Sequence, residues 1–152
     1  MPLFLVQHGK KNPEHLDPEK GLSAEGSREV ERSAGVLRTH GVPVSEIWHS
    51  GKKRARQTAD IIAGYLGEDV KVKEKEGLGP LDDVTSLNPD PDKNLLMVGH
   101  LPFMERLVSS LVTGSPDHPP LVKFQNGGVV ALERDGETGS WYIKWTLFPD
   151  IH

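Results

Sequence analysis

The chain alternates between short apolar runs and polar segments rich in glycine and proline. The runs Leu3–Val6 and Leu95–Val98 are apolar at every position, which is typical of strands buried on both faces of a sheet. Shorter strands are predicted over Val44–His49 and around Val70 and Val72. These segments predict four strands, and two of them are expected to be buried on both faces.

Between these strands, apolar residues recur at helical spacing. A first helix is predicted from about Ala24 to His40, with Ser23 as its N-cap and Gly41 and Pro43 as its stop. A second helix follows a basic turn and is capped by Gly67; a third has Pro102 in its first turn. The apolar faces of the second and third helices comprise Ala55, Ala59, Ile62, Ala63 and Leu66, and Phe103, Leu107 and Leu111, respectively.

The last third of the chain predicts a hairpin. Residues 128–133 and 141–147 alternate apolar and polar positions, and Asp135-Gly136 lies between them. The resulting order β-α-β-α-β-loop-β-α-β-β predicts an α/β fold, a three-layer α/β/α sandwich whose mostly parallel sheet has an antiparallel edge. Its 152 residues show no internal repeat and no boundary, so we expect one domain over residues 1–152.

Composition narrows the classes of function. The formal net charge of −4 gives no overall positive field, so nucleic acid is not an expected partner. The chain has no cysteine, which excludes disulfides, thiol catalysis and cysteine-ligated zinc. No run approaches the ~20 apolar residues of a membrane span, so we expect a cytoplasmic protein without a membrane partner. The histidines outside the strand ends are His15, His40, His118 and His152. Their spacing fits no metal-ligand pattern, so no metal is expected.

Three predicted strands end in histidine. His8, His49 and His100 lie at or just beyond these ends, where ligands bind in open α/β sheets, and His8 and His100 adjoin glycines that allow close approach. A strand-end histidine can also be a partly buried residue whose ring bonds a backbone carbonyl. Because His8 and His100 lie in equivalent places, a ligand site and this structural role are equally good interpretations of the two residues.

A cluster of cations marks the start of the second predicted helix. Four of the five residues 52–56 are Lys or Arg. A helix N-terminus already carries partial positive charge, so cations there are unfavourable unless an anion lies nearby. A solvated basic turn is the alternative. No aromatic residues interleave, so the pattern does not favour nucleic acid, and no glycine-rich nucleotide loop follows the first strand.

Together these segments resemble the histidine phosphatase superfamily, which is phosphoglycerate mutase-like in fold, and within it the small phosphohistidine phosphatases of the SixA type. The similarity extends from Leu3 to about Phe148 with its motifs in order. They are His8-Gly9, the helix start Gly21–Gly26, Arg54-Ala55-Arg56-Gln57-Thr58-Ala59, and Val98-Gly99-His100-Leu101-Pro102.

The resemblance implies a phosphatase that hydrolyses phosphohistidine or another phosphomonoester. His8 would be the nucleophile and form a covalent phosphohistidine. His100 would donate to the phosphoryl oxygens, and Arg54 would clamp two of them. Gly9 and Leu101 would contribute to substrate binding, without any cofactor. Arg56 aligns with a variable position and is expected at the surface.

One position departs from the family pattern: Gln7 stands where the family has arginine. A neutral amide in place of a charged donor should cost about 1–3 kcal/mol, or about 5- to 150-fold in rate. Part of the field can be restored by nearby lysines, namely Lys10, Lys11, Lys52 and Lys53. The alternative is a weak or inactive phosphate- or phosphoprotein-binding module.

The acid that would protonate the leaving group is not fixed by spacing. Glu76, Asp82 and Asp83 lie in the loop where family members often carry a carboxylate, and each can equally be a solvated loop residue. An imidazole leaving group needs little protonation, so phosphohistidine requires no strong acid. The short connections predict an open cleft, and the expected substrate is a phosphorylated protein or a small phosphomonoester.

Overall fold

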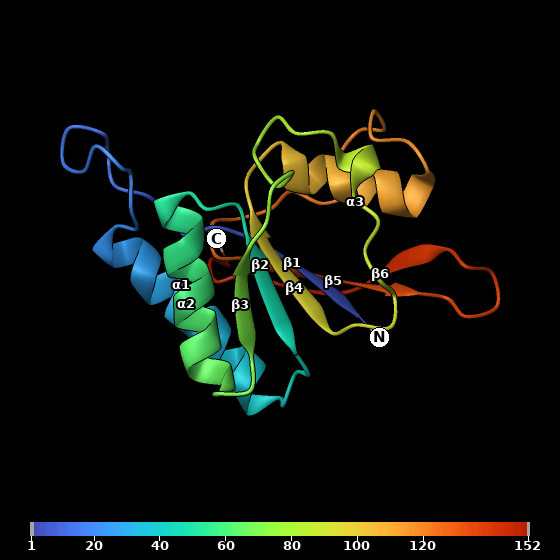
Figure 1. The fold of residues 1–152 in the computed structure, drawn as a ribbon, viewed down its shortest axis with the longest axis horizontal. Coiled ribbons are helices and arrows are strands. Elements are labelled where there is room, and N and C mark those ends of the chain that lie inside the picture. Colours follow the sequence, from blue (N-terminus) through green and yellow to red (C-terminus); the bar gives the residue numbers. More distant parts are fainter. Residues whose placement is uncertain (1, 152) are drawn as a thin grey trace.

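The computed structural model describes residues 2–151. Six strands and three α-helices follow one another in the predicted order, with a 3₁₀ turn in the loop before the fourth strand (Figure 1). They are β1 (Leu3–Gln7), α1 (Ala24–Thr39), β2 (Glu46–His49), α2 (Lys53–Leu66), β3 (Lys71–Glu74), η1 (Val84–Ser86), β4 (Leu95–Gly99), α3 (Phe103–Thr113), β5 (Val129–Arg134) and β6 (Trp141–Leu147).

The strands form one sheet in the order β3-β2-β4-β1-β5-β6. The pairs β3–β2, β2–β4 and β4–β1 are parallel, whereas β5 and β6 add an antiparallel edge. Helices α1 and α2 lie together on one face, and α3 lies on the other (Figure 1). The predicted three-layer α/β/α sandwich with a mostly parallel sheet is therefore confirmed.

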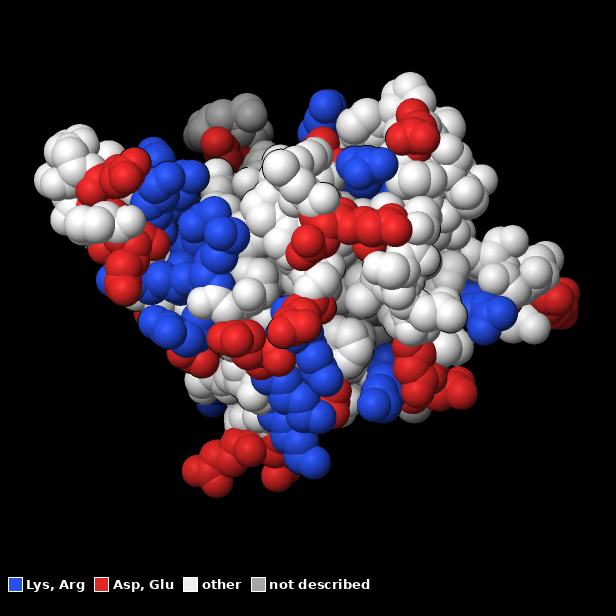
Figure 2. All heavy atoms as spheres, turned by 45° about the horizontal axis from the view of Figure 1, so that its top comes forward, with Lys and Arg blue, Asp and Glu red and all other residues white. Residues whose placement is uncertain are grey.

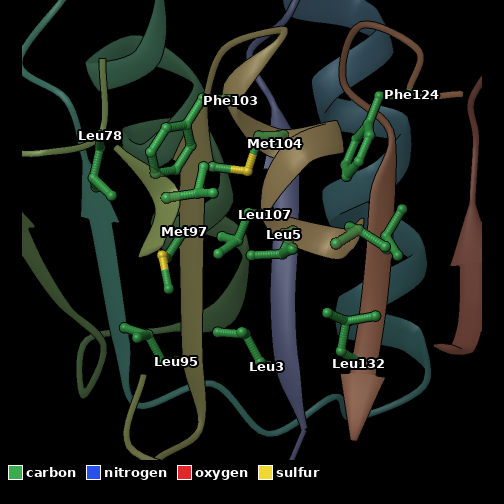
Figure 3. Close-up of a cluster of buried hydrophobic side chains, with 13 residues drawn as sticks. Leu3, Leu5, Leu78, Leu95, Met97, Phe103, Met104, Leu107, Phe124 and Leu132 are labelled. Atoms are coloured by element: carbon green, nitrogen blue, oxygen red, sulfur yellow. The ribbon is translucent and has the colours of Figure 1, made fainter. Parts of the chain in front are cut away.

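Each face of the sheet has its own hydrophobic core, because successive strand residues point to opposite sides. On β1, Leu3 and Leu5 pack toward α3, whereas Phe4 and Val6 pack toward α1 and α2. Figure 3 shows the α3 side, where Phe103, Met104 and Leu107 lie over Leu3, Leu5, Leu95, Met97 and Leu132. The two apolar runs predicted as doubly buried strands are the central pair of the sheet.

The start of α1 is fixed against the segment that follows β1. Ser23 caps the helix, as predicted, by accepting a hydrogen bond from the Gly26 N–H at 3.0 Å. A Cβ on Gly26 would collide with the Lys10 carbonyl oxygen, so only glycine lets the helix come this close. Because Ser23 N–H also donates to Lys10 O, the helix holds the chain just beyond His8 in place.

The ends of several elements differ slightly from the sequence prediction. Strand β2 begins at Glu46 rather than Val44, because Ser45 N–H bonds Asn94 O before the ladder with β4 starts. Strand β3 is a charged edge over Lys71–Glu74, a composition that discourages pairing with other chains. Pro102 caps α3 instead of lying in its first turn.

None of the helices in the described part of the chain is both long and apolar enough to cross a lipid bilayer.

Candidate active site

The sheet brings His8 and His100 together across 92 positions of sequence. In the parallel ladder of β1 and β4, Gln7 pairs with Gly99, so each histidine is the next residue along its strand. His8 N–H donates to Gly99 O at 3.0 Å, and the two imidazole ring centroids lie 5.0 Å apart. The strand-end rule therefore correctly predicted that these two histidines share one edge of the sheet.

The hydrogen bonds of His8 define its tautomer. Its Nδ1 lies 2.7 Å from the Gly9 carbonyl oxygen, which can only accept, so Nδ1 carries the proton. The lone pair is then on Nε2, where it accepts from Arg54 Nε at 3.4 Å. Burial lowers the pKa of His8 to about 4, against the opposing effect of the Gly9 hydrogen bond. His8 is thus a neutral imidazole near pH 7, with its Nε2 lone pair directed to the guanidinium of Arg54.

His100 is almost fully buried, and Ser50 holds its ring. The Ser50 hydroxyl oxygen lies 2.6 Å from His100 Nε2, whereas Nδ1 has no hydrogen-bond partner among the described residues. Burial lowers the pKa of His100 to about 3, and the neighbouring His8 and the charges of Arg54, Lys52 and Lys11 act in the same direction. If Ser50 donates to Nε2, His100 presents an unpartnered Nδ1–H, a form that can donate to an oxyanion.

The first turn of α2 supplies Arg54 and locks it to the segment after β1. Thr58 Oγ1 donates to Arg54 O at 2.8 Å and accepts from Gly9 N–H at 3.0 Å. Thr58 is fully buried, so this link is shielded from water. The Thr58 side chain therefore fixes the start of α2 relative to His8. In the sequence, only its place in the motif pointed to this residue.

A cavity of about 520 Å³ opens in front of the two histidines. It is lined by Gln7, His8, Lys10, Lys11, Arg54, Pro80, His100, Leu101 and Asn126. Four residues predicted to act on substrate, in addition to Gln7, thus lie around one cavity: His8, Arg54, His100 and Leu101. Gly9 acts through its backbone, by fixing His8 Nδ1 and by bonding Thr58.

Gln7 occupies the position of the missing family arginine and does line the cavity. Its Oε1 is buried and has no hydrogen-bond partner among the described residues. Asn126, which sequence analysis did not identify, donates to His8 O at 3.1 Å and lines the same cavity. Two neutral amides therefore stand beside the histidines.

No carboxylate is among the residues, within 2–151, that line this cavity. Asp83 caps the turn η1 by accepting from Thr85 N and Oγ1, and these hydrogen bonds lower its pKa. Glu76 and Asp82 line a neighbouring hollow with Ser50 and Lys52, and Asp82 accepts from Gly79 N. The structure therefore does not bring the three candidate acids to the histidines.

The lysines near the site fall into two groups. Lys10 pairs with Glu25 at 2.9 Å, and Lys53 pairs with Asp17 at 3.1 Å. Lys11 and Lys52 form no ion pair within the described part of the chain, and both help to lower the pKa of His100. Of the four lysines expected to add positive potential, these two are the ones whose charge is not locally neutralised.

His49 has a structural role, although its ring bonds a backbone N–H and not the carbonyl that the alternative interpretation of strand-end histidines expected. It is buried, and its Nδ1 accepts from Gly51 N–H at 3.1 Å, away from the residues that line the cavity. His15, His40 and His118 are exposed, and His152 lies outside the described residues. Across residues 2–151, no group of three or more His, Asp or Glu side chains is arranged to hold a metal ion.

Comparison with known structures supports the same fold. The protein histidine phosphatase SixA, solved in complex with tungstate, superposes with a TM-score of 0.82 at 22% identity and covers 98% of this chain and 97% of that one. SixA from Agrobacterium tumefaciens gives a TM-score of 0.75 at 19% identity over 98% of both chains. A phosphoserine phosphatase mutant from Entamoeba histolytica, solved with phosphoserine, gives 0.69 at 15% identity over 95% of both.

Sequence comparison assigns the family. A protein of Nocardia uniformis subsp. tsuyamanensis designated an esterase, NocK, is 31% identical over an alignment of 144 residues that covers 93% of this chain. The chain spans only 30% of that relative's length. Residues 3–82 match the family model of the histidine phosphatase superfamily (branch 1), more than half of the chain and the segment that carries His8 and Arg54. This protein therefore belongs to the histidine phosphatase superfamily (branch 1).

Proposed function

We propose that this protein is a phosphatase that removes the phosphoryl group from phosphohistidine through a covalent intermediate on His8. The observation that carries the proposal is the state of His8: buried, neutral, protonated on Nδ1, with the Nε2 lone pair on the cavity side beside Arg54. A nucleophilic imidazole needs this tautomer and this access. Membership of the superfamily and the fold shared with SixA support the same reaction class.

In the first step, His8 Nε2 attacks phosphorus and the bond from phosphorus to the leaving group breaks. The leaving group departs with the electron pair of that bond. An imidazole whose ring is already protonated in the substrate departs as the neutral molecule, and an unprotonated leaving group takes a proton from water. In the second step water attacks the phosphohistidine, inorganic phosphate leaves, and His8 regains its lone pair. Arg54 and His100 would stabilise the negative charge on the transferring oxygens, with Gln7 as a neutral donor.

The absence of carboxylates around the cavity, within the described residues, bears on the substrate. An alkoxide leaves with difficulty unless a general acid protonates it, whereas an imidazole accepts a proton near neutral pH and leaves readily. A cavity lined by two histidines, cations and amides, without an acid, therefore fits a phosphohistidine better than a phosphoserine. A small phosphomonoester with a good leaving group is the next best fit.

A second candidate function is supported by Gln7. With a neutral amide in place of arginine, the site would bind a phosphoryl group with one fewer charged donor, and turnover would suffer first because charge develops in the transition state. In this form the protein would be a phosphate- or phosphoprotein-binding module. Both candidates use the same cavity and differ only in whether phosphate is released.

Turnover of matched peptides separates the two functions. We expect release of phosphate from a phosphohistidine peptide, at least 10-fold slower release from the corresponding phosphoserine peptide, and loss of about 10⁴-fold or more in His8→Gln. Release of phosphate that persists in His8→Gln would refute the nucleophile assignment. Binding of the phosphohistidine peptide without any release would establish the binding module.

A further inference from the structure

The cavity lined by His8, Arg54 and His100 is named the phosphate cavity, after the ligand proposed for it, and a second groove adjoins it and shares Arg54 with it. This basic groove, of about 390 Å³, is lined by Pro18, Glu19, Lys20, Gly51, Lys52, Lys53, Arg54 and Arg56. It lies between the start of α2 and the loop that projects after β1, drawn in blue at the left of Figure 1. Arg54 therefore has the phosphate cavity on one side and the basic groove on the other.

The basic groove has an excess of positive charge. Lys20 pairs with Glu14 at 3.9 Å, and Lys53 pairs with Asp17 and Glu19. Lys52 and Arg56 form no ion pair with any described residue, and Glu19 is the one carboxylate residue among those that line the groove. The chain as a whole carries −4, so this local surplus runs against the overall charge.

The same surplus extends across the mouth of the phosphate cavity. Lys11 lines that cavity, and its pKa is lowered by burial and by the charges of Arg54, Lys20 and Lys52, so these cations lie within electrostatic range of one another. Figure 2 shows Lys and Arg gathered in a continuous patch on the left of the face that it presents. Cations that repel one another at the start of a helix are stabilised when anions bind between them.

We propose that the basic groove binds acidic residues that flank the phosphohistidine of a polypeptide substrate. This inference rests on the proposed function, because it assumes a phosphoryl group bound beside His8. The phosphoryl group would occupy the cavity between His8 and Arg54, and carboxylates a few positions away in the substrate chain would pair with Lys52 and Arg56.

The character of the groove favours a polypeptide over a compact small molecule. Sites for small ligands use buried, convergent polar groups, whereas Lys52 and Arg56 are exposed. Exposed ion pairs contribute about 0.2–1 kcal/mol each, and they steer encounter more than they add affinity. Several weak, long-range contacts spread over two hollows suit an extended acidic segment that docks transiently, is dephosphorylated and leaves.

The test compares binding of two labelled peptides that carry a phosphonate analogue of phosphohistidine. One has three flanking glutamates and the other three flanking glutamines, and binding is followed by fluorescence anisotropy in 50 mM salt. We expect the acidic peptide to bind about 3- to 30-fold more tightly, and this ratio to decline in 300 mM salt. Lys52→Gln/Arg56→Gln should reduce the ratio at least threefold.

The matched control removes one lysine and one arginine elsewhere. Arg38 lies in the last turn of α1, Lys71 begins β3, and both are exposed and belong to neither hollow, so Arg38→Gln/Lys71→Gln should keep the ratio. Equal affinity for the two peptides, or an equal loss of preference in both double variants, would overturn the proposal. A different result would assign the groove to a compact anion. In that case the two peptides would bind equally well, and pyrophosphate would compete less strongly with them in Lys52→Gln/Arg56→Gln but not in the control variant.

This readout separates the groove from the reaction. An acidic preference that depends on Lys52 and Arg56 upholds the groove even if no phosphate is ever released, in which case the phosphatase proposal fails and the groove belongs to a binding module. Normal phosphate release with equal affinity for both peptides leaves the phosphatase intact and removes the groove.

Discussion

Two hollows of nearly equal size lie on this protein, and they differ in what surrounds them. One, of about 540 Å³, lies between the end of α1 and β6 and is lined mainly by apolar groups such as Phe4, Val36 and Trp145. The other, of about 520 Å³, holds His8, His100 and Arg54 at the ends of β1 and β4. Volume does not distinguish them.

The difference shows which property makes a site. The apolar hollow follows from packing between a helix end and an edge strand, and part of its lining belongs to the core cluster on the α1 side: Phe4, Leu37, Val42, Trp145 and Leu147. In the phosphate cavity, the Nε2 lone pair of His8 meets the guanidinium of Arg54, and the neighbouring His100 has a ring nitrogen without a hydrogen-bond partner among the described residues. Polar groups that converge on one point and are held in place by the fold are what stabilisation of a transferring phosphoryl group requires.

Removal of the positive charge of Arg54 from the phosphate cavity should have the largest effect on activity. Arg54→Gln should lower kcat/KM for a phosphohistidine peptide by about 10²–10³-fold, because a charged donor to the transferring oxygens is lost. Steady-state kinetics of the variant beside Arg38→Gln, which removes an exposed arginine at the far end of α1, measures the effect. A loss below 10-fold in Arg54→Gln would show that the guanidinium does not stabilise the transferring phosphoryl oxygens.

Addition of a positive charge at position 7, next to His8, should increase activity. Gln7→Arg restores the arginine of the family pattern in a residue that already lines the cavity, and should raise kcat/KM by about 5- to 150-fold. Gln7→Lys is the control for charge without the planar fork, and should recover less. No change in Gln7→Arg would mean that Lys11 and Lys52 already supply the missing field.

The buried histidines of the phosphate cavity should also make stability depend on pH. The pKa of His100 is about 3 in the folded chain and 6.5 in the unfolded one, so between these values the unfolded chain binds the extra proton. The free energy of unfolding should therefore fall as pH drops below 6.5, by about 2 kcal/mol at pH 5 for this residue.

Denaturant titrations of wild type and His100→Asn at pH 7.5 and pH 5 isolate this contribution. The loss of stability between the two pH values should be about 2 kcal/mol smaller in His100→Asn, whatever its absolute stability. Equal losses in both proteins would show that His100 does not resist protonation in the fold.

The apolar hollow should give the smallest effect on activity. Trp145 is partly buried, and its ring centroid lies 5.8 Å from that of Phe4, so Trp145→Ala should lower the free energy of unfolding by about 2 kcal/mol. We expect kcat/KM per folded molecule to stay within about twofold of wild type when measured well below Tm. A larger change in kcat/KM would show that the two hollows are coupled.

Most of the fold could be predicted because the strands and helices carry strong patterns. Leu3–Val6 and Leu95–Val98 are apolar throughout and form the central pair, which places His8 and His100 side by side. The strand-end rule did not separate these two from His49, whose ring bonds its own turn. That distinction depends on which way each side chain leaves the strand end.

The remaining site residues depend on contacts between distant segments. Ser50 reaches His100 because β2 lies beside β4, an adjacency that the order of elements along the chain does not fix. Asn126 reaches His8 through the loop that leads into β5, and such a contact has no signal in local composition. The loop before β4 likewise directs Asp83 to cap η1, and spacing alone could not choose among its carboxylates.

The proposed role of His8 as the nucleophile is tested most directly by an experiment that locates the phosphoryl group on the protein. The protein is incubated with a phosphodonor and quenched at alkaline pH, where phosphohistidine persists; tandem mass spectrometry then identifies the modified residue, and ³¹P NMR identifies the nitrogen. Because His8 Nδ1 donates to Gly9 O, we expect a single phosphohistidine at His8, on Nε2, that is absent in His8→Gln. A phosphoryl group on His100, or phosphate release by a protein that never becomes phosphorylated, would contradict it.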